Sequence, residues 1–383
     1  MTDWQHGGFG LYIHWPFCAA KCPYCDFNSH VSAHIDQTRW KSAYLAEITR
    51  AQGETAGRRL DTIFFGGGTP SLMNPDLVAE IIASARAAWP MRNDPEITLE
   101  ANPTSIEAGR FAAYRQAGVT RVSMGMQAMN DADLRRLGRM HSAAEAMAAF
   151  DIARTHFDRV NFDLIYARQD QTITDWKAEL TRALDLAVDH LSLYQLTIED
   201  GTAFGARHQA GGLKGLPSDD LSADMYALTQ DLTAAKGLAG YEISNHAREG
   251  AQSLHNLIYW RGGDYIGIGP GAHGRLTLNG TRWATECPKS PEFWLQMVAA
   301  GKGEGAREAL TGESHALEYL MMSLRLLEGT SLARYNALSP APLDMLHVDE
   351  LVHLGLLGHV SDRIFPTDAG KILLNSIIRQ LAG

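Results

Sequence analysis

The chain has 383 residues and a formal net charge of −10, and 45% of its residues are hydrophobic against 20% charged. This composition supports a folded core and excludes a disordered tail, while the acidic balance argues against nucleic-acid binding. With four cysteines, three of them within eight residues, the chain is not a disulfide-stapled secreted domain. The first residues lack the apolar core of a signal peptide, and no uncharged apolar run reaches the roughly 20 residues of a membrane span. We therefore expect a cytoplasmic protein, with peripheral contact at the inner membrane and dimerisation left open.

Six short runs rich in β-branched and aromatic residues occur in the first half of the chain, each followed by a helix-favouring segment. The runs cover residues 9–14, 62–65, 96–99, 121–124, 160–166 and 190–196. They are apolar on both faces, which is typical of strands that are covered on both sides. The intervening segments, such as 75–88 and 175–188, are alanine-rich. This alternation predicts an α/β fold in which helices surround a parallel sheet, either open or closed into a barrel.

Polar residues follow the ends of these runs. The first run leads into the three cysteines and the second into the glycines of residues 66–68. The other runs lead into or contain Glu100, Gln127, Asp163, Gln195, Thr197 and Glu199. Barrel enzymes place their chemistry at the carboxyl ends of strands, so this recurrence favours a shared site. The plainer interpretation is that loops begin with polar residues in most proteins.

The pattern changes after about residue 205. A helix is expected over 219–236, residues 241–283 are rich in turns with short strands, and GKGEG at 301–305 is typical of a linker. Beyond it, a helix that turns into a short strand pair over 351–365 lies between two apolar stripes at helical spacing. We predict three parts: a partial barrel over 1–205, a barrel extension over 206–304, and a small winged-helix-like helical domain over 305–383.

The cysteines Cys18, Cys22 and Cys25 form a CxxxCxxC motif in one short loop. Three thiolates can surround one metal centre, and thiolates bind both iron–sulfur clusters and zinc. A structural zinc site completed by His14 or His30 is one alternative, although such sites usually combine two separated ligand pairs. Three ligands on a [4Fe-4S] cluster leave one iron open, which is typical of a reactive centre.

The CxxxCxxC motif after the first strand and GGGTP at 66–70 together resemble the radical S-adenosylmethionine (SAM) enzymes. The resemblance implies a partial (β/α)6 barrel with a [4Fe-4S] cluster, held by Cys18, Cys22 and Cys25, whose open iron binds SAM. In that superfamily the reduced cluster cleaves SAM to a 5′-deoxyadenosyl radical. SAM contacts are implied for Tyr12, Tyr24, Gly67, Gly68, Thr69, Glu100, Gln127, Arg139 and Asp163. The residue types suit this role, because glycines allow close backbone approach and an arginine can pair bidentately with a carboxylate.

YIHWPFC at 12–18 is similar to the branch that contains oxygen-independent coproporphyrinogen III oxidase and the haem chaperone HemW. The oxidase carries a further cysteine where Phe27 stands here, and a long extension where only eleven residues precede Tyr12. HNLIYW at 255–260 resembles the HNxxYW signature that is associated with haem in HemW. The resemblance therefore implies haem contacts at His255, Asn256, Tyr259 and Trp260. If the segment is helical, His255 and Tyr259 share a face.

Three functions are compatible with these motifs. The favoured one is a haem chaperone that binds [4Fe-4S], SAM and haem and delivers haem to membrane haemoproteins of the respiratory chain. The alternatives are oxidative decarboxylation of coproporphyrinogen III and a cluster-bearing electron-transfer or scaffold protein. HNLIYW has its own alternative as a packing segment, which would make His246, His273 and Cys287 the other haem candidates. One departure from the family is ARQDQT at 167–172, where GLPGQT is usual, so we expect that loop to take another shape.

Overall fold

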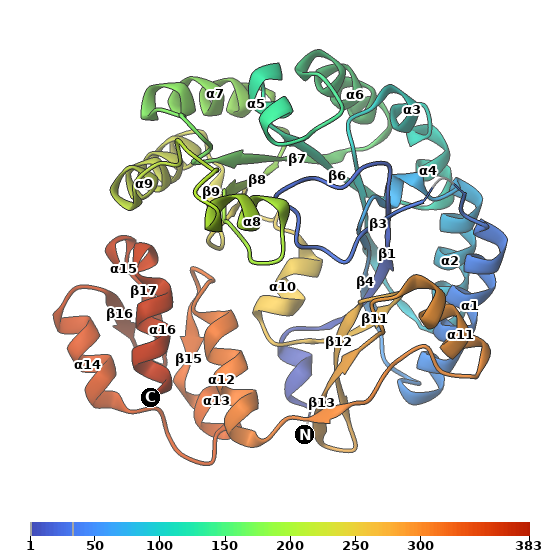
Figure 1. The fold of residues 1–383 in the computed structure, drawn as a ribbon. Coiled ribbons are helices and arrows are strands. Elements are labelled where there is room, and N and C mark those ends of the chain that lie inside the picture. Colours follow the sequence, from blue (N-terminus) through green and yellow to red (C-terminus); the bar gives the residue numbers. More distant parts are fainter. Residues whose placement is uncertain (1, 33) are drawn as a thin grey trace.

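The computed structural model describes residues 2–32 and 34–383, and a curved sheet of twelve strands forms its centre (Figure 1). Six neighbouring strands run parallel to one another in chain order. They are β1 (Phe9–Trp15), β4 (Leu60–Gly67), β5 (Met91–Ala101), β6 (Arg121–Gln127), β7 (Arg159–Tyr166) and β8 (His190–Gln195). Each overlaps one of the six predicted runs. The partial (β/α)6 barrel expected from the sequence is therefore confirmed.

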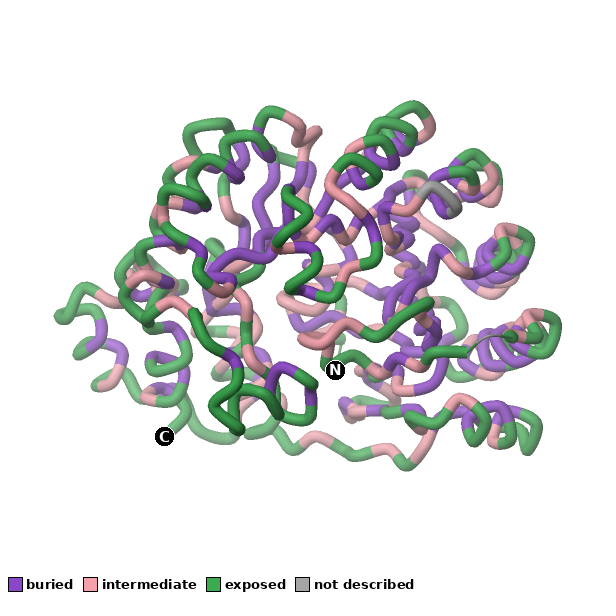
Figure 2. The backbone as a smooth tube through the Cα atoms, turned by 45° about the horizontal axis from the view of Figure 1, so that its top comes forward, coloured by how far each residue is buried: buried purple, intermediate pink, exposed green. Residues whose placement is uncertain are grey.

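The helices between these strands cover the outer face of the sheet (Figure 1). They are α1 (Gln37–Glu54), α2 (Pro75–Ala88), α3 (Ser105–Ala108), α4 (Phe111–Ala117), α5 (Asp131–Arg136), α6 (Ala143–His156) and α7 (Ile173–Leu186). Side-chain caps fix where several of them begin: Asn74 caps α2, and Ser142 and Thr172 form capping boxes on α6 and α7. Figure 2 shows the consequence, with buried strands inside a ring of helices whose outer sides are exposed.

The sheet continues beyond the barrel strands on both sides, and the sequence did not predict these pairings. On one side β11 (Asp264–Ile268) pairs parallel with β1, and β12 (His273–Leu278), β13 (Thr281–Glu286) and β14 (Glu308–Ala309) follow antiparallel. On the other side β8 is followed by β10 (Asn245–Ala247) and β9 (Ala239–Gly240). Three helices accompany them: α8 (Ala203–Gln209), α9 (Asp219–Ala235) and α11 (Pro291–Ala299).

Helix α10 (Leu254–Trp260), which carries HNLIYW, lies near the centre of the ring of helices (Figure 1). It begins at Ser253, whose side chain caps the backbone N–H of Asn256. The backbone N–H of His255 donates to Glu96 of β5, and its ring reaches Thr62 of β4. Thr62 is near the start of β4, and Glu96 lies beside it in the sheet, five residues before the carboxyl end of β5. Helix α10 therefore lies across the opposite end of the barrel from the cysteines.

The last part of the chain has a hydrophobic core of its own. It contains α12 (Gly312–Ser323), α13 (Leu332–Leu338), α14 (Met345–His353), α15 (Asp368–Ile372) and α16 (Leu374–Ala382) with strands β15 (Thr330–Ser331), β16 (Leu357–Val360) and β17 (Arg363–Pro366). The predicted helix and strand pair over 351–365 correspond to α14, β16 and β17. Arg334 connects this part to the N-terminus through two 2.8 Å hydrogen bonds to Asp3. The domain boundaries at 205 and 304 stay a prediction.

The loop at 167–172, where the sequence departs from the family pattern, contains two residues in the left-handed region; whether its shape differs from the family's stays a prediction. Ala167 and Asp170 have φ angles of +57° and +58°, in the left-handed region that favours glycine. Ala167 and Asp170 stand at the two positions where the family usually has glycine. This chain therefore adopts left-handed conformations there with non-glycine residues. The buried Arg168 side chain donates to Asp133 at 2.8 Å and to Glu179 at 2.5 Å, which anchors the loop against α5 and α7.

In the part of the chain that the structure describes, no helix has both the length and the apolar composition that a membrane span requires.

Candidate cluster and cofactor site

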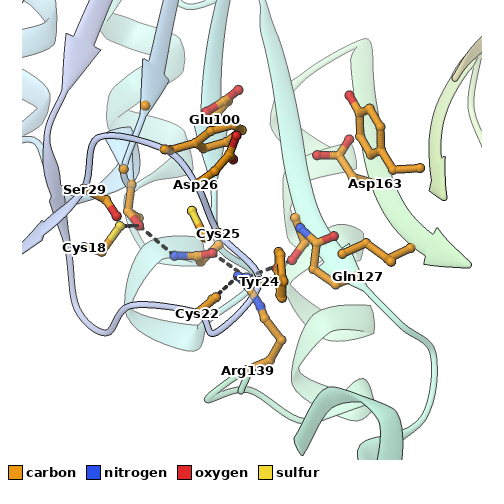
Figure 3. A pocket seen from close by; sticks show the side chains of 18 of the residues that line it. Cys18, Cys22, Tyr24, Cys25, Asp26, Ser29, Glu100, Gln127, Arg139 and Asp163 are labelled. Carbon is orange, nitrogen blue, oxygen red and sulfur yellow. Dashed lines mark hydrogen bonds between the residues drawn. The ribbon is translucent and has the colours of Figure 1, made fainter. Parts of the chain in front are cut away.

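A cavity of about 330 Å³ opens at the carboxyl ends of the barrel strands (Figure 3). All three motif cysteines line it, together with eight of the nine residues expected to contact SAM. These eight are Tyr24, Gly67, Gly68, Thr69, Glu100, Gln127, Arg139 and Asp163. Gln195, Thr197 and Glu199, which end the sixth predicted strand, also line the cavity. Residues that are far apart in the sequence thus come together at one site.

Tyr12 is the exception among the expected SAM contacts, since it does not line this cavity. Its ring packs against Phe64 inside the barrel, and its hydroxyl pairs with His14 Nδ1 at 3.0 Å. Several lining residues were not singled out from the sequence, among them Asp26, Ser29 and Asn102. The rule that polar residues gather after strands applies to Asn102, which stands directly after β5.

The glycine loop after β4 leaves space that a side chain would fill. Gly68 donates its N–H to Trp15 O and Thr69 donates its N–H to Phe17 O, so the loop lies directly beside the cysteine segment. A Cβ atom on Gly68 would come within 2.7 Å of Phe17 O and 3.0 Å of Cys18 Sγ. Only glycine therefore keeps this approach to the first cysteine open.

The thiols suit a cluster better than a single zinc ion. In the described residues, no three His, Cys, Asp or Glu side chains converge closely enough to hold one metal ion. For a cubane cluster the three sulfurs do not have to reach one metal ion, because each thiolate binds a different iron. The histidines proposed for zinc have other partners: His14 Nε2 pairs with Asn28 O at 2.9 Å, and His30 Nε2 with Asn28 Oδ1 at 3.2 Å. With both histidines engaged elsewhere, the three cysteines are the ligands that suit cluster iron.

The guanidinium of Arg139 already donates hydrogen bonds to three protein atoms. Its Nη1 donates to Cys22 Sγ at 3.4 Å, and its Nη2 donates to Asn102 Oδ1 at 2.5 Å and to Gly125 O at 3.0 Å. Bidentate pairing with a carboxylate, as the sequence suggested, would require these bonds to change partner. Its buried Nε has no partner among the described residues. The guanidinium therefore keeps at least one N–H, at Nε, that no protein atom in the described part of the chain accepts.

Among the carboxyl groups that line the cavity, Glu100 and Asp163 are the two with raised pKa values (Figure 3). Burial, reinforced by the nearby Asp163, raises the pKa of Glu100 to about 8. Burial also raises the pKa of Asp163 to about 6, against the hydrogen bond that Ser123 donates to it at 3.3 Å. In the ligand-free protein Glu100 is therefore mostly protonated at neutral pH, and a cationic ligand would favour its ionised form.

We predict that Glu100→Gln changes how stability depends on pH. Because the pKa of Glu100 is raised from 4.5 to about 8, the folded state binds more protons than the unfolded state between these values. Stability contributed by this group is therefore present at low pH and is lost as pH rises through that window. Urea unfolding of the ligand-free variant should lie within about 1 kcal/mol of the wild type at pH 5 and exceed it by about 4 kcal/mol at pH 8.5. Parallel pH profiles for the two proteins would refute the raised pKa.

The residues expected to contact haem lie outside the cavity. His255 is 1% exposed, and both of its ring nitrogens are hydrogen-bonded: Nδ1 to Thr62 Oγ1 at 2.6 Å and Nε2 to Tyr259 Oη at 2.7 Å. Its ring stacks on Phe64. The sequence predicted correctly that His255 and Tyr259 share a helix face. On that face the two side chains are hydrogen-bonded to each other. In this conformation neither nitrogen fits an iron ligand, and haem coordination there would require α10 to move.

Of the other three haem candidates, two are buried and one is exposed. His246 and Cys287 are buried, and His273 is 58% exposed on its side chain, 3.9 Å from Glu286. Burial lowers the pKa of His246 to about 4.

Comparisons with known proteins agree with this geometry. The radical SAM superfamily model matches residues 12–182, and the HemN C-terminal domain model matches residues 310–373. The haem chaperone HemW of Escherichia coli is 37% identical over 373 residues, which cover 96% of each chain. The chain belongs to the HemW family of radical SAM proteins. Members of the radical SAM superfamily use a [4Fe-4S] cluster and SAM.

HemW from Mycobacterium tuberculosis is 36% identical over 380 residues, covering 98% of this chain and 95% of that relative. The mouse protein named radical S-adenosyl methionine domain-containing protein 1, mitochondrial, is 39% identical over 337 residues, or 86% of this chain and 76% of its own. Among solved structures, coproporphyrinogen III oxidase (HemN) from Escherichia coli superimposes with a TM-score of 0.82 at 23% identity, covering 99% of this chain and 92% of that one. That likeness concerns the fold alone.

Proposed function

We propose that the protein is a haem chaperone that binds a [4Fe-4S] cluster, SAM and haem, and that it passes haem to membrane haemoproteins of the respiratory chain. The observation that carries this proposal is the match to HemW along nearly the whole of both chains. Haem is the cargo in this scheme, whereas the cluster and SAM are resident groups. The acceptor class follows from the family resemblance.

The residues of the cavity suit the two resident groups. Cys18, Cys22 and Cys25 would hold the cluster, whose open iron supplies a binding position and an electron for SAM. Gly67 and Gly68 admit the ligand close to the backbone. Arg139, whose Nε has no partner in the described part of the protein, would donate to the SAM carboxylate. Glu100, Gln127 and Asp163, which line the same cavity, would bind its ammonium and hydroxyl groups.

Phe27 favours the chaperone over the oxidase. It lines the cavity and is 57% exposed, at the position where the resemblance places an additional cysteine in the oxidase. A phenyl ring has no thiolate and cannot replace that group. The HNLIYW segment supports the same assignment as a family signature, although its His255 is not available as a ligand in this conformation.

The experiment that separates the two functions is anaerobic incubation with coproporphyrinogen III, SAM and dithionite. We expect the reconstituted protein to leave the porphyrinogen unchanged and to bind haem with a Soret band distinct from that of free haem. Formation of protoporphyrinogen IX at catalytic rates would overturn the chaperone proposal in favour of the oxidase.

A further inference from the structure

Three side chains from separate loops connect two of the cysteines through hydrogen bonds. Thr69, after β4, donates from Oγ1 to Cys18 Sγ at 3.4 Å, and Arg139, after α5, donates from Nη1 to Cys22 Sγ at 3.4 Å. Asn102 lies between them: its Nδ2 donates to Thr69 Oγ1 at 3.1 Å, and its Oδ1 accepts from Arg139 Nη2 at 2.5 Å. We call Thr69, Asn102 and Arg139 the sulfur arc; dashed lines mark its hydrogen bonds near the labelled Cys18, Cys22 and Arg139 in Figure 3.

The centre of the sulfur arc is anchored to the barrel. The backbone N–H of Asn102 donates to Glu107 Oε2 at 2.8 Å and contacts Ser71 Oγ at 3.3 Å. Glu107 and Ser71 are themselves buried and hydrogen-bonded to each other. Pro103 follows Asn102 and limits its backbone to an extended conformation. The backbone that carries the Asn102 side chain is therefore held in place by buried partners.

An asparagine suits this position for a chemical reason. The primary amide donates through nitrogen and accepts through oxygen at the same time, so it can hold a hydroxyl on one side and a guanidinium on the other. An aspartate would only accept, and an alanine would do neither. Because Thr69 Oγ1 accepts from Asn102, its own hydrogen is free to point at Cys18 Sγ.

We propose that Asn102 is a positioning residue for the cluster: it holds Thr69 and Arg139 against Cys18 and Cys22, and so raises the reduction potential of the bound cluster. The physical reason is that a hydrogen bond to a thiolate sulfur stabilises the more negative, reduced state. Loss of Asn102 frees both donors to turn away, and the reduced state then loses that stabilisation. The inference rests on the cluster ligation proposed above.

The test is a potentiometric titration of the reconstituted protein without SAM. Dithionite supplies the single electron in the presence of redox mediators, and the electron paramagnetic resonance signal of the reduced cluster reports the extent of reduction. For Asn102→Ala we expect the wild-type iron content and about a tenfold less favourable reduction, which for one electron is a downward shift of 59 mV.

Two further variants make the test specific. Asn28→Ala removes another asparagine of the cysteine segment, whose amide pairs with Pro270 O, Lys289 O and His30 Nε2 and, among the described residues, with no cysteine. We expect it to leave the potential unchanged. Thr69→Val removes the hydroxyl next to Cys18 and should lower the potential by part of the Asn102→Ala shift. Since Thr69 and Asn102 act on the cluster together, the double variant Thr69→Val, Asn102→Ala should lower the reduction potential by less than the sum of the two single shifts.

Several outcomes would overturn the proposal. An unchanged potential in Asn102→Ala with normal iron content would do so, as would an equal shift in Asn28→Ala. If Asn102→Ala fails to take up iron, Thr69→Val decides by the same titration, and the absence of a shift there refutes the role of the sulfur arc. A wild-type chain that takes up no iron would overturn the cluster assignment and this inference with it.

Discussion

Replacing Cys18, Cys22 or Cys25 by serine is expected to abolish the broad visible absorption of the reconstituted protein. The three sulfurs line one cavity and are its thiol ligands, since His14 and His30 are hydrogen-bonded elsewhere. A serine oxygen is a harder and poorer ligand for cluster iron than a thiolate, so the loss of one sulfur removes a third of the ligation. Iron content and the absorption spectrum after anaerobic reconstitution measure the effect.

Cys287→Ser is the matched control for these variants. Cys287 is 2% exposed, and its thiol lies 3.7 Å from Gly267 O, in the sheet extension rather than in the cavity lining. We expect this variant to keep its iron and its spectrum. A loss equal to that of the motif variants would mean that the ligand set is wrong.

His255→Ala is expected to destabilise the fold strongly and to leave haem binding by the folded protein unchanged. The imidazole is buried, stacks on Phe64, and satisfies Thr62 and Tyr259. Removing it leaves a cavity and two unpaired hydroxyls, which together cost about 3 kcal/mol. Neither ring nitrogen is free for iron, so the Soret band should not move. Urea unfolding and haem titration measure the two effects separately.

His273→Ala is the comparison variant for His255→Ala, because His273 is exposed on the sheet extension. We expect it to change the free energy of unfolding by less than about 0.5 kcal/mol. If folded His255→Ala protein instead loses its Soret band while iron content stays normal, His255 is a haem ligand. Helix α10 must then leave the barrel when haem binds.

The parts of the fold that depend on local pattern could be predicted from the sequence. Strands buried on both faces appear as continuous apolar runs, and all six barrel strands were placed in this way. Polar residues at their carboxyl ends predicted the lining of the cavity, because parallel strands bring those ends together.

What depends on contacts between distant residues could not be predicted. Strand spacing puts Tyr12 and His14 on one side of β1, but the packing of Tyr12 against Phe64 of β4, outside the cavity lining, depends on the folded sheet. The position of α10 depends on Thr62 and Glu96, more than 150 residues earlier in the chain. The role of Asn102 depends equally on the placement of its partners in the folded chain. The family signature at 255–260 indicated the family correctly without indicating where its side chains lie.

The most direct measurement of the central claim is haem transfer. The protein, reconstituted with its cluster and loaded with one equivalent of haem, is incubated anaerobically with membranes that carry haem-free respiratory haemoprotein. The proposed function predicts that the Soret band of the donor decays while that of the acceptor appears, faster than with the same concentration of free haem or haem–albumin. Haem that stays on the protein, or that reaches the acceptor no faster than from albumin, would contradict a chaperone function.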